Sequence, residues 1–389
     1  MSAIRAARVP QAELEVASPE KPGVDLKLLV PTLALVSLGV AMVFSASIPM
    51  TAAGEQEDVF YYLKREGLVA AISLLAMFGV TRLPMGWIRR RAGVLLGATI
   101  ALLVLVLKFG TEVNGARSWF VVPGIGLHFQ PSEMAKMVLV IAAARYFVQF
   151  PQGIPNWRRA IPPVAMLGAT AGLVALQPDM GTAALIAFSM FVYFHIAGLK
   201  LRHLLATGLA ASIPAALIAL THPYQIGRLV DFVKGSEVEL AGGYQTARSL
   251  IALGSGGLTG SGYCGSIEKY FYLPEATTDS ILAVVGEELG LLATWAVVGL
   301  FAYLVWRGLF IAARSPDRFA ALVAAGVSCS LGIQALVNIA VVTGSVPATG
   351  VPLPFVSYGG SSLLFSLIGV GLLINVSREM AAAAAQQRP

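Results

Sequence analysis

Long apolar runs alternate with short polar segments along almost the whole chain. A helix that crosses a bilayer needs about 20 mostly apolar residues, so each run near this length is a candidate membrane span. The pattern predicts an all-α polytopic membrane protein with ten transmembrane helices. The expected ranges are 26–48, 66–82, 92–109, 131–150, 160–176, 180–198, 203–220, 279–306, 319–343 and 355–376.

The remaining segments divide into two tails and one large loop. Residues 1–25 are polar and contain three prolines, so we expect a disordered cytoplasmic tail there. Residues 26–378 form the predicted membrane domain, and residues 379–389 a second, short cytoplasmic tail. The long loop at 221–278, between spans 7 and 8, is predicted to be extracytoplasmic and to pack on the outer face of the bundle. Loops longer than about 15 residues are usually functional or disordered.

Composition and charge support a membrane protein and exclude several other classes. Hydrophobic residues make up 57% of the chain and charged residues 12%, about half the charged fraction of a soluble domain. These values exclude a soluble globular enzyme, a disordered chain and a nucleic-acid-binding module. With the N-terminus inside, 18 Lys and Arg residues lie in inner segments and 8 in outer ones. Because cytoplasmic loops carry the basic excess, both termini are predicted to be cytoplasmic.

The two cysteines give no disulfide framework and no metal set. Cys329 lies in an apolar run and Cys264 in a glycine-rich segment. We therefore expect both thiols to be unpaired.

Glu133 and Lys136 lie within the fourth predicted span. Charged groups inside a span are costly and usually face a cavity or a partner. The two residues are three positions apart, so they share a helix face. Two interpretations remain open, and they are compatible: a neutralised pair that orients the span, or a polar cavity wall near the outer leaflet.

Asp279 opens the eighth predicted span, directly after the long outer loop. An acidic residue at a helix N-terminus can simply cap it. Its place at the membrane boundary also makes it a candidate for chemistry. Glu287 and Glu288 lie deeper in the same span, and we expect them to brace neighbouring helices or to lie near a cavity.

Three further features lie at predicted outer ends of the bundle. Arg117 could bind a phosphate, although its segment could equally be an interface anchor. Asp179 is expected to satisfy a tight turn. The segment 347–362 carries three prolines and a Gly pair, which are tolerated at membrane depth only where protein or water covers the backbone. It predicts a re-entrant or broken segment that lines a cavity.

Several catalytic motifs are absent from the sequence. It has no Walker A motif, no Cys/His metal spacing and no Gly-x-Ser-x-Gly elbow. The four histidines are scattered. Any chemistry must therefore depend on carboxylates, Lys and Arg, with an oxygen-bound cation as an additional option.

The chain resembles the SEDS family, which includes FtsW, RodA and a sporulation homologue, and it is more similar to FtsW than to RodA. The resemblance covers nearly the whole membrane domain, with the matching segments in family order. These segments are Asn114–Phe120, Gln130–Lys136, Gln177–Thr182, Gly243–Ser249, Gly254–Gly262, Leu273–Gly290 and Asn338–Ser362.

The resemblance implies a peptidoglycan glycosyltransferase that polymerises lipid II at the outer face of the bacterial cytoplasmic membrane, during cell division or elongation. Asp279 matches the family's essential Asp and is our candidate general base. Arg117, Glu133 and Lys136 match family positions as well. The residues predicted to bind substrate are Arg117, Glu133, Lys136, Lys269, Ser357 and Ser361. No cofactor is certain; a divalent cation, Mg²⁺ or Mn²⁺, held by Asp279 and Glu133 is one source of positive charge for the leaving pyrophosphate.

The resemblance also implies a partner, a class B penicillin-binding protein, because the chain has no soluble domain that could cross-link glycan. We expect its single span to pack through small residues, with Gly299 and Ala302 on span 8 and Ala320, Ala324 and Ser328 on span 9 as candidates. The latter three could instead pack span 9 within its own bundle. Two alternative functions remain: a lipid II flippase and a non-catalytic scaffold for the penicillin-binding protein.

Overall fold

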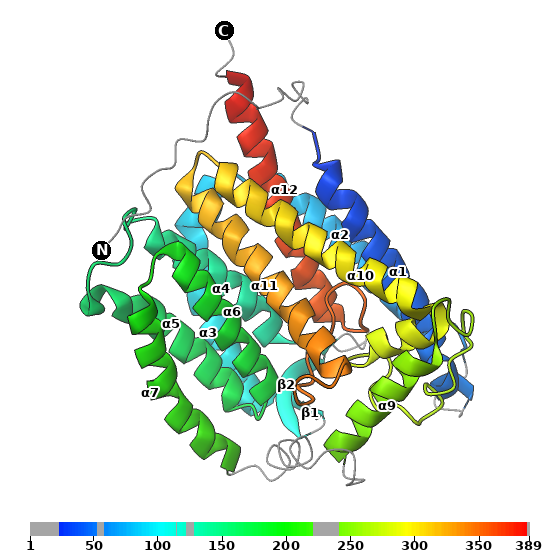
Figure 1. The fold of residues 1–389 in the computed structure, drawn as a ribbon. Coiled ribbons are helices and arrows are strands. Elements are labelled where there is room, and N and C mark those ends of the chain that lie inside the picture. The colour runs from blue at the N-terminus through cyan, green and yellow to red at the C-terminus, as the bar shows by residue number, and fades with distance from the viewer. Residues whose placement is uncertain (1–22, 53–57, 114, 122–127, 221–240, 387–389) are drawn as a thin grey trace.

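The computed structural model describes residues 23–52, 58–113, 115–121, 128–220 and 241–386, and these residues form a helical bundle (Figure 1). The predicted disordered tail lies almost entirely outside the described residues. The helices are α1 (Leu26–Ala52), α2 (Tyr61–Val80), α3 (Met85–Phe109), α4 (Pro131–Phe147), α5 (Trp157–Ala175), α6 (Met180–Ala197), α7 (Leu201–Leu220), α9 (Ala241–Ser255), α10 (Ile281–Arg314), α11 (Arg318–Val342) and α12 (Gly360–Gln386).

Each of the ten predicted spans coincides with one helix, and α9 falls within the long loop. Six of the described helices, α1, α3, α6, α10, α11 and α12, are long and apolar enough to cross a membrane. Mostly helical architecture is therefore confirmed, whereas the count of ten membrane crossings stays a prediction. The C-terminal tail differs from expectation: α12 continues to Gln386, because the Ala-rich segment has high intrinsic helix propensity.

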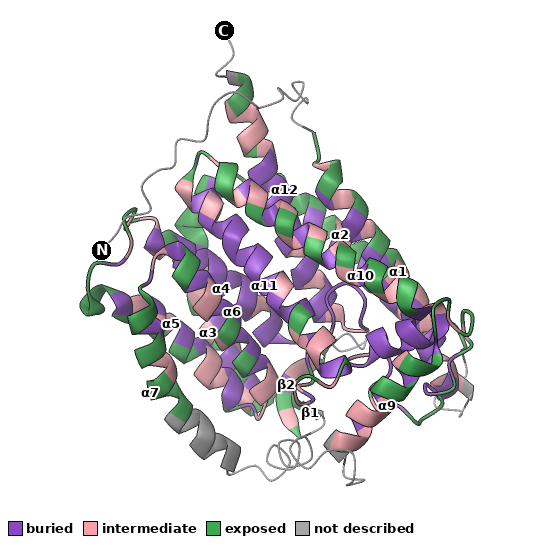
Figure 2. Cartoon of the chain, in the orientation of Figure 1, coloured by how far each residue is buried: buried purple, intermediate pink, exposed green. Residues whose placement is uncertain are grey.

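The interior of the bundle is built around α11, which packs against α10, α6, α4 and α12. Figure 2 shows α11 and α4 as largely buried, whereas α7 and the outward side of α10 carry many exposed residues. On α4 nearly every residue from Pro131 to Ala144 is buried. Such a helix is enclosed by protein rather than lipid, which makes its charged residues unavailable to bulk water.

Three short strands join α3 to α4 at one end of the bundle. They are β1 (Thr111–Val113), β2 (Ala116–Val121) and β3 (His128–Phe129), and they form an antiparallel sheet in the order β1-β2-β3. Gln130 follows β3 directly, and α4 begins at the next residue, Pro131. Pro suits this first turn because its missing N–H would have no helical partner there.

The α10 helix is interrupted at Gly290, whose φ of 80° is outside the helical region. In an unbroken helix the N–H groups of residues 291 and 292 would donate to the carbonyls of residues 287 and 288. Here Leu291 N donates to Gly257 O at 2.9 Å, and Leu292 N donates to Leu258 O at 3.3 Å.

The two freed carbonyls are satisfied by the same loop. Ser261 N donates to Glu287 O at 2.9 Å, and Gly262 N to Glu288 O at 3.0 Å. The glycine-rich run 254–262 therefore fills the break in α10, rather than only resting on the outer face of the bundle as the sequence predicted. Close backbone contact of this kind requires residues without a Cβ at Gly260 and Gly290.

Candidate functional site

Asp279 lies on a short segment whose backbone is fixed by groups from other parts of the bundle. Three successive carbonyls of this segment accept hydrogen bonds. Thr277 O accepts from Tyr358 N at 2.9 Å, Thr278 O from the Ser357 hydroxyl at 2.6 Å and Asp279 O from Asn338 Nδ2 at 2.8 Å. The side chain of Asp279 is largely buried, with 8% of its surface exposed. A carboxylate on such a fixed backbone is held in place before any substrate arrives.

Asn338 is one of two polar side chains on the same face of α11. Gln334 lies one turn earlier, and its Nε2 donates to Pro352 O at 2.9 Å. Asn338 Nδ2 also donates to Val351 O at 2.9 Å. The non-helical segment before α12 is thus attached to α11 at two successive carbonyls. This supports a broken segment covered by protein within 347–362, whereas its lining of a cavity stays a prediction.

Gln334 also connects this segment to the charged pair on α4. Lys136 Nζ donates to Gln334 Oε1 at 2.5 Å and to Glu133 at 2.8 Å. Both charged side chains are almost completely buried. The ammonium therefore has polar partners on two helices, which favours the interpretation of a neutralised pair that orients α4. Through Gln334 and Asn338, the pair and Asp279 share one supporting helix.

At the same end of the bundle, Gln130 and Asp179 connect the starts of α4 and α6, and Ser361 on α12 also bonds to Gln130. Asp179 caps α6 by accepting from Thr182 N at 3.1 Å, and its other oxygen accepts from Gln130 Nε2 at 3.1 Å. The predicted turn role of Asp179 is confirmed. Burial raises the pKa of this carboxyl above its ordinary value.

Ser357 and Ser361 use their hydroxyls within the protein. Ser357 accepts from Leu353 N at 2.8 Å while donating to Thr278 O. Ser361 accepts from Gln130 N at 2.9 Å and donates to His128 O at 3.0 Å. These bonds hold the segments around Asp279 and β3 together, which gives both serines a positioning role; their direct contact with substrate stays a prediction.

Lys269 is enclosed by protein in the loop before α10. Its side chain is fully enclosed beside Glu288, with the two charged atoms 2.8 Å apart. The ammonium also donates to Ser45 Oγ at 3.0 Å and to Cys264 O at 2.9 Å. All three donors are used within the protein, which favours a structural role; contact of Lys269 with substrate stays a prediction.

Glu287 and Glu288 hold the loop that precedes α10, whereas the sequence predicted that they brace neighbouring helices or lie near a cavity. Glu287 accepts from Ile267 N at 2.8 Å and from the Ser266 hydroxyl at 2.5 Å. Glu288 accepts from Cys264 N at 3.0 Å. Both carboxylates therefore fix residues 264–267 beside the break in α10.

Arg117 lies on β2, where about half of its side chain is exposed. Glu112 is 3.5 Å away, and both side chains reach solvent. The structure therefore leaves Arg117 accessible, in contrast to Lys136 and Lys269.

Arg65 on α2 is a residue that the sequence did not single out as functional. Its guanidinium lies 2.9 Å from His128 Nδ1 and over the Tyr358 ring at 5.7 Å from the centroid. Tyr358 is next to Ser357, which places Arg65 close to the Asp279 segment. Burial, followed by the charge of Arg65, lowers the pKa of His128. The only sequence signal was a basic residue at the outer end of a span, which contributed to the orientation count alone.

Comparison with known proteins identifies the family. Residues 26–382 match the family model for FtsW, RodA and SpoVE, described as a cell cycle protein. The chain belongs to this family. This confirms the resemblance to the SEDS family that the sequence motifs indicated.

Named relatives cover nearly the full length of the chain. A protein of *Halomonas elongata* described as "Probable peptidoglycan glycosyltransferase FtsW" is 40% identical over 93% of this chain and 92% of its own length. The stage V sporulation protein E of *Bacillus subtilis* is 38% identical over 92% of this chain and 98% of its own length. The chain is therefore FtsW-like.

Solved structures of the family share the fold. The rod shape determining protein RodA of *Thermus thermophilus* is 30% identical, with a TM-score of 0.68 over 92% of this chain and 97% of that chain. A chain in a structure titled "Structural coordination of polymerization and crosslinking by a peptidoglycan synthase complex" is also 30% identical, with a TM-score of 0.73 over 92% of this chain and 98% of that chain. As a family member with long apolar helices, the protein is an integral membrane protein.

The described part of this FtsW-like chain offers few ligands for a metal ion. Within it, no group of three or more His, Cys, Asp or Glu side chains is arranged to hold one. Glu133, one of the two predicted ligands, already pairs with Lys136. These residues do not fit a divalent cation without rearrangement, so we derive no step through one.

Proposed function

We propose that this chain is a peptidoglycan glycosyltransferase that polymerises lipid II, with Asp279 as the general base. The observation that carries the proposal is the fixed backbone of residues 277–279, which holds one carboxylate just before the start of α10. The relatives named as peptidoglycan glycosyltransferases support the same activity. We further propose a role in division or elongation, as the FtsW-like character suggests.

The reaction joins two lipid-linked sugars. The 4-hydroxyl of the acceptor attacks the anomeric carbon of the donor, and undecaprenyl pyrophosphate leaves. A hydroxyl is a poor nucleophile until its proton is removed, so Asp279 accepts that proton as the new C–O bond forms. The electron pair of the broken bond departs on the pyrophosphate.

The leaving pyrophosphate needs cationic stabilisation. Among the residues near this end of the bundle, Arg65 and Arg117 are the candidates, because the ammonium groups of Lys136 and Lys269 are enclosed by protein. A guanidinium can form two parallel hydrogen bonds with phosphate oxygens. We propose that both arginines bind this group.

We propose the following membrane arrangement. The helices α1–α7 and α10–α12 each cross the cytoplasmic membrane, with both termini in the cytoplasm and Asp279 at the outer side. The excess of Lys and Arg in the segments that would then be inner supports this orientation. A class B penicillin-binding protein would cross-link the glycan that this chain produces, consistent with a similar chain occurring in a peptidoglycan synthase complex.

Purified chain and lipid II in detergent test the activity, with and without a class B penicillin-binding protein. We expect glycan polymer to form. Detergent micelles have no leaflets to cross, so a flippase would produce no polymer there. A scaffold would likewise produce no polymer by itself. If the penicillin-binding protein had to be added for polymer to form, and the Asp279→Asn variant then gave as much polymer as the unmodified chain, the proposal would be contradicted.

A further inference from the structure

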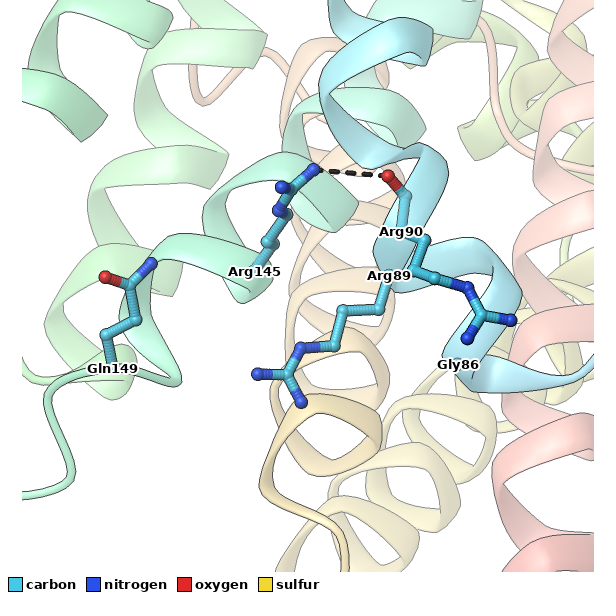
Figure 3. Close-up of a pocket in the computed structure, with 5 residues that line it drawn as sticks. All are labelled: Gly86, Arg89, Arg90, Arg145 and Gln149. Carbon is cyan, nitrogen blue, oxygen red and sulfur yellow. Dashed lines mark hydrogen bonds between the residues drawn. The ribbon is translucent and has the colours of Figure 1, made fainter.

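A cavity of about 410 Å³ lies between the start of α3 and the end of α4, and three arginines line it (Figure 3). Its lining residues are Gly86, Arg89, Arg90, Arg145 and Gln149. The cavity is distant from the candidate site. Arg145 is twelve residues after Glu133 on α4, which corresponds to about 18 Å along a helix.

The charges of this cavity are not neutralised by acidic residues of the described chain. Within that part of the protein, no carboxylate lies within ion-pair distance of Arg89, Arg90 or Arg145. Arg145 donates to the backbone carbonyl of Arg90 at 3.3 Å, and Arg89 lies over the Phe319 ring at 6.0 Å. Collecting like charges without counter-ions is unfavourable, and an anion between them would relieve the repulsion.

Figure 3 shows how the two helices present these groups. The Arg89 side chain extends into the space between α3 and α4, and Arg145 turns its guanidinium toward the Arg90 carbonyl. The Arg90 side chain points away from Arg145. Arg89, Arg145 and Gln149 all line the cavity, and guanidinium and amide N–H groups are donors that suit the oxygens of a phosphate group.

The surroundings place the cavity at the depth of lipid headgroups. Trp87, which directly follows the lining residue Gly86 on α3, is 41% exposed, and the Arg91 guanidinium lies over its ring at 5.9 Å. Exposed Trp is typical of the membrane–water interface. Basic pockets between membrane helices on the cytoplasmic side are suited to anionic lipid headgroups.

We propose that this cavity binds the phosphate headgroup of an anionic phospholipid through Arg89 and Arg145. The proposed membrane orientation places this lipid in the inner leaflet. The binding site itself is inferred only from the cavity and its arginines, independently of that orientation. It would attach α3 and α4 to the lipid on the side of the membrane opposite to Asp279. A free phosphate anion has the same binding chemistry, so the test must separate the two sources.

The test uses the full-length chain in detergent and fluorescent phosphatidylglycerol as the probe, with phosphatidylcholine and inorganic phosphate as competitors. We expect phosphatidylglycerol to bind and Arg89→Gln with Arg145→Gln to weaken binding at least about tenfold. The matched control is Arg91→Gln with Arg158→Gln, which removes the same charge from exposed positions outside the cavity and should change affinity less than about twofold.

Three outcomes would overturn the proposal. The two double variants could lose affinity equally, which would assign binding to general surface charge. The cavity variant could bind like the unmodified chain. Inorganic phosphate could displace the probe as well as unlabelled phosphatidylglycerol does, which would make the occupant a soluble anion. Thermal unfolding of each variant verifies that it is folded. The variant Arg89→Lys with Arg145→Lys keeps the positive charge but lacks the forked donors of guanidinium, so it should also bind more weakly.

Discussion

At the scale of single residues, Asp279 is the position at which function can be separated from folding. Asp279→Asn keeps the size of the side chain and leaves the backbone carbonyl that accepts from Asn338. We expect the variant to fold and insert normally but to lose polymerisation, because general base catalysis contributes about 10²–10⁴-fold. A lipid II polymerisation assay measures the loss.

The control for Asp279→Asn is Asp58→Asn. This changes an exposed carboxylate whose partner is Lys64, and it should leave the rate unchanged. If Asp279→Asn kept more than about a tenth of the unmodified rate, Asp279 would not be the base.

Glu133 and Lys136 form a second residue-scale test. Removing one partner leaves a buried unpaired charge, which costs about 3–5 kcal/mol. Glu133→Gln and Lys136→Met should therefore each reduce expression and thermal stability. Because the pair is enclosed by α4 and α11, we expect the double variant to regain most of both.

Activity of the double variant distinguishes the two interpretations of the pair. A neutralised orienting pair predicts a double variant that is stable and active, whereas a wall of the substrate cavity predicts one that is stable and inactive. Single variants with full stability and full activity would contradict both.

At the scale of elements, the sequence predicted the helices well because the bilayer requires runs of a fixed length. It did not predict the break in α10, since residues 279–306 are one apolar run in which only Asp279, Glu287 and Glu288 are charged. The internal contacts of Lys269 were missed for a related reason. Its partner Ser45 is 224 positions away in the chain, so no local spacing could show that the ammonium is already satisfied.

In the candidate site, too, the sequence revealed residues with a local signal and missed those whose contacts come from distant segments. Asp279 was identified from its place at a span boundary, which is a local property. Arg65 was not identified, because its proposed role depends on His128 and Tyr358, which the fold brings to it from distant segments.

The break in α10 gives an element-scale prediction about Gly260. This residue has a φ of 81°, and a Cβ on it would collide with the Glu288 backbone. Gly260→Ala should therefore separate the loop from the break and leave polar backbone groups unsatisfied, at a cost of about 1–3 kcal/mol. We expect a lower Tm in detergent.

Gly254→Ala is the matched control for this prediction. It lies at the start of the same glycine-rich run, where an added Cβ would meet nothing within 4 Å. Its Tm should be within error of the unmodified chain. Equal stability of the two variants would mean that close contact at Gly260 is not required.

At the scale of the whole molecule, the structure limits the surfaces on which a partner's membrane helix could pack. Ala320, Ala324 and Ser328 on α11 are buried within the bundle, so the prediction that they face a partner is wrong. Their small size instead permits close packing of α11, as where Ser328 contacts Gly308. Gly299 and Ala302 on α10 remain exposed.

We therefore expect a class B penicillin-binding protein to dock on the outward face of α10. Gly299 leaves open space on this face, and nearby Trp295 is 64% exposed, so a second helix could approach closely there. Gly299→Leu with Ala302→Trp should abolish co-purification with the partner and its stimulation of polymerisation, while polymerisation by the chain alone stays unchanged. Gly168→Leu fills comparable open space on α5 and should leave the complex intact. If the α10 variant still co-purified with the partner, the docking face would have to lie on another helix, and the small residues of α10 would serve only its contact with lipid.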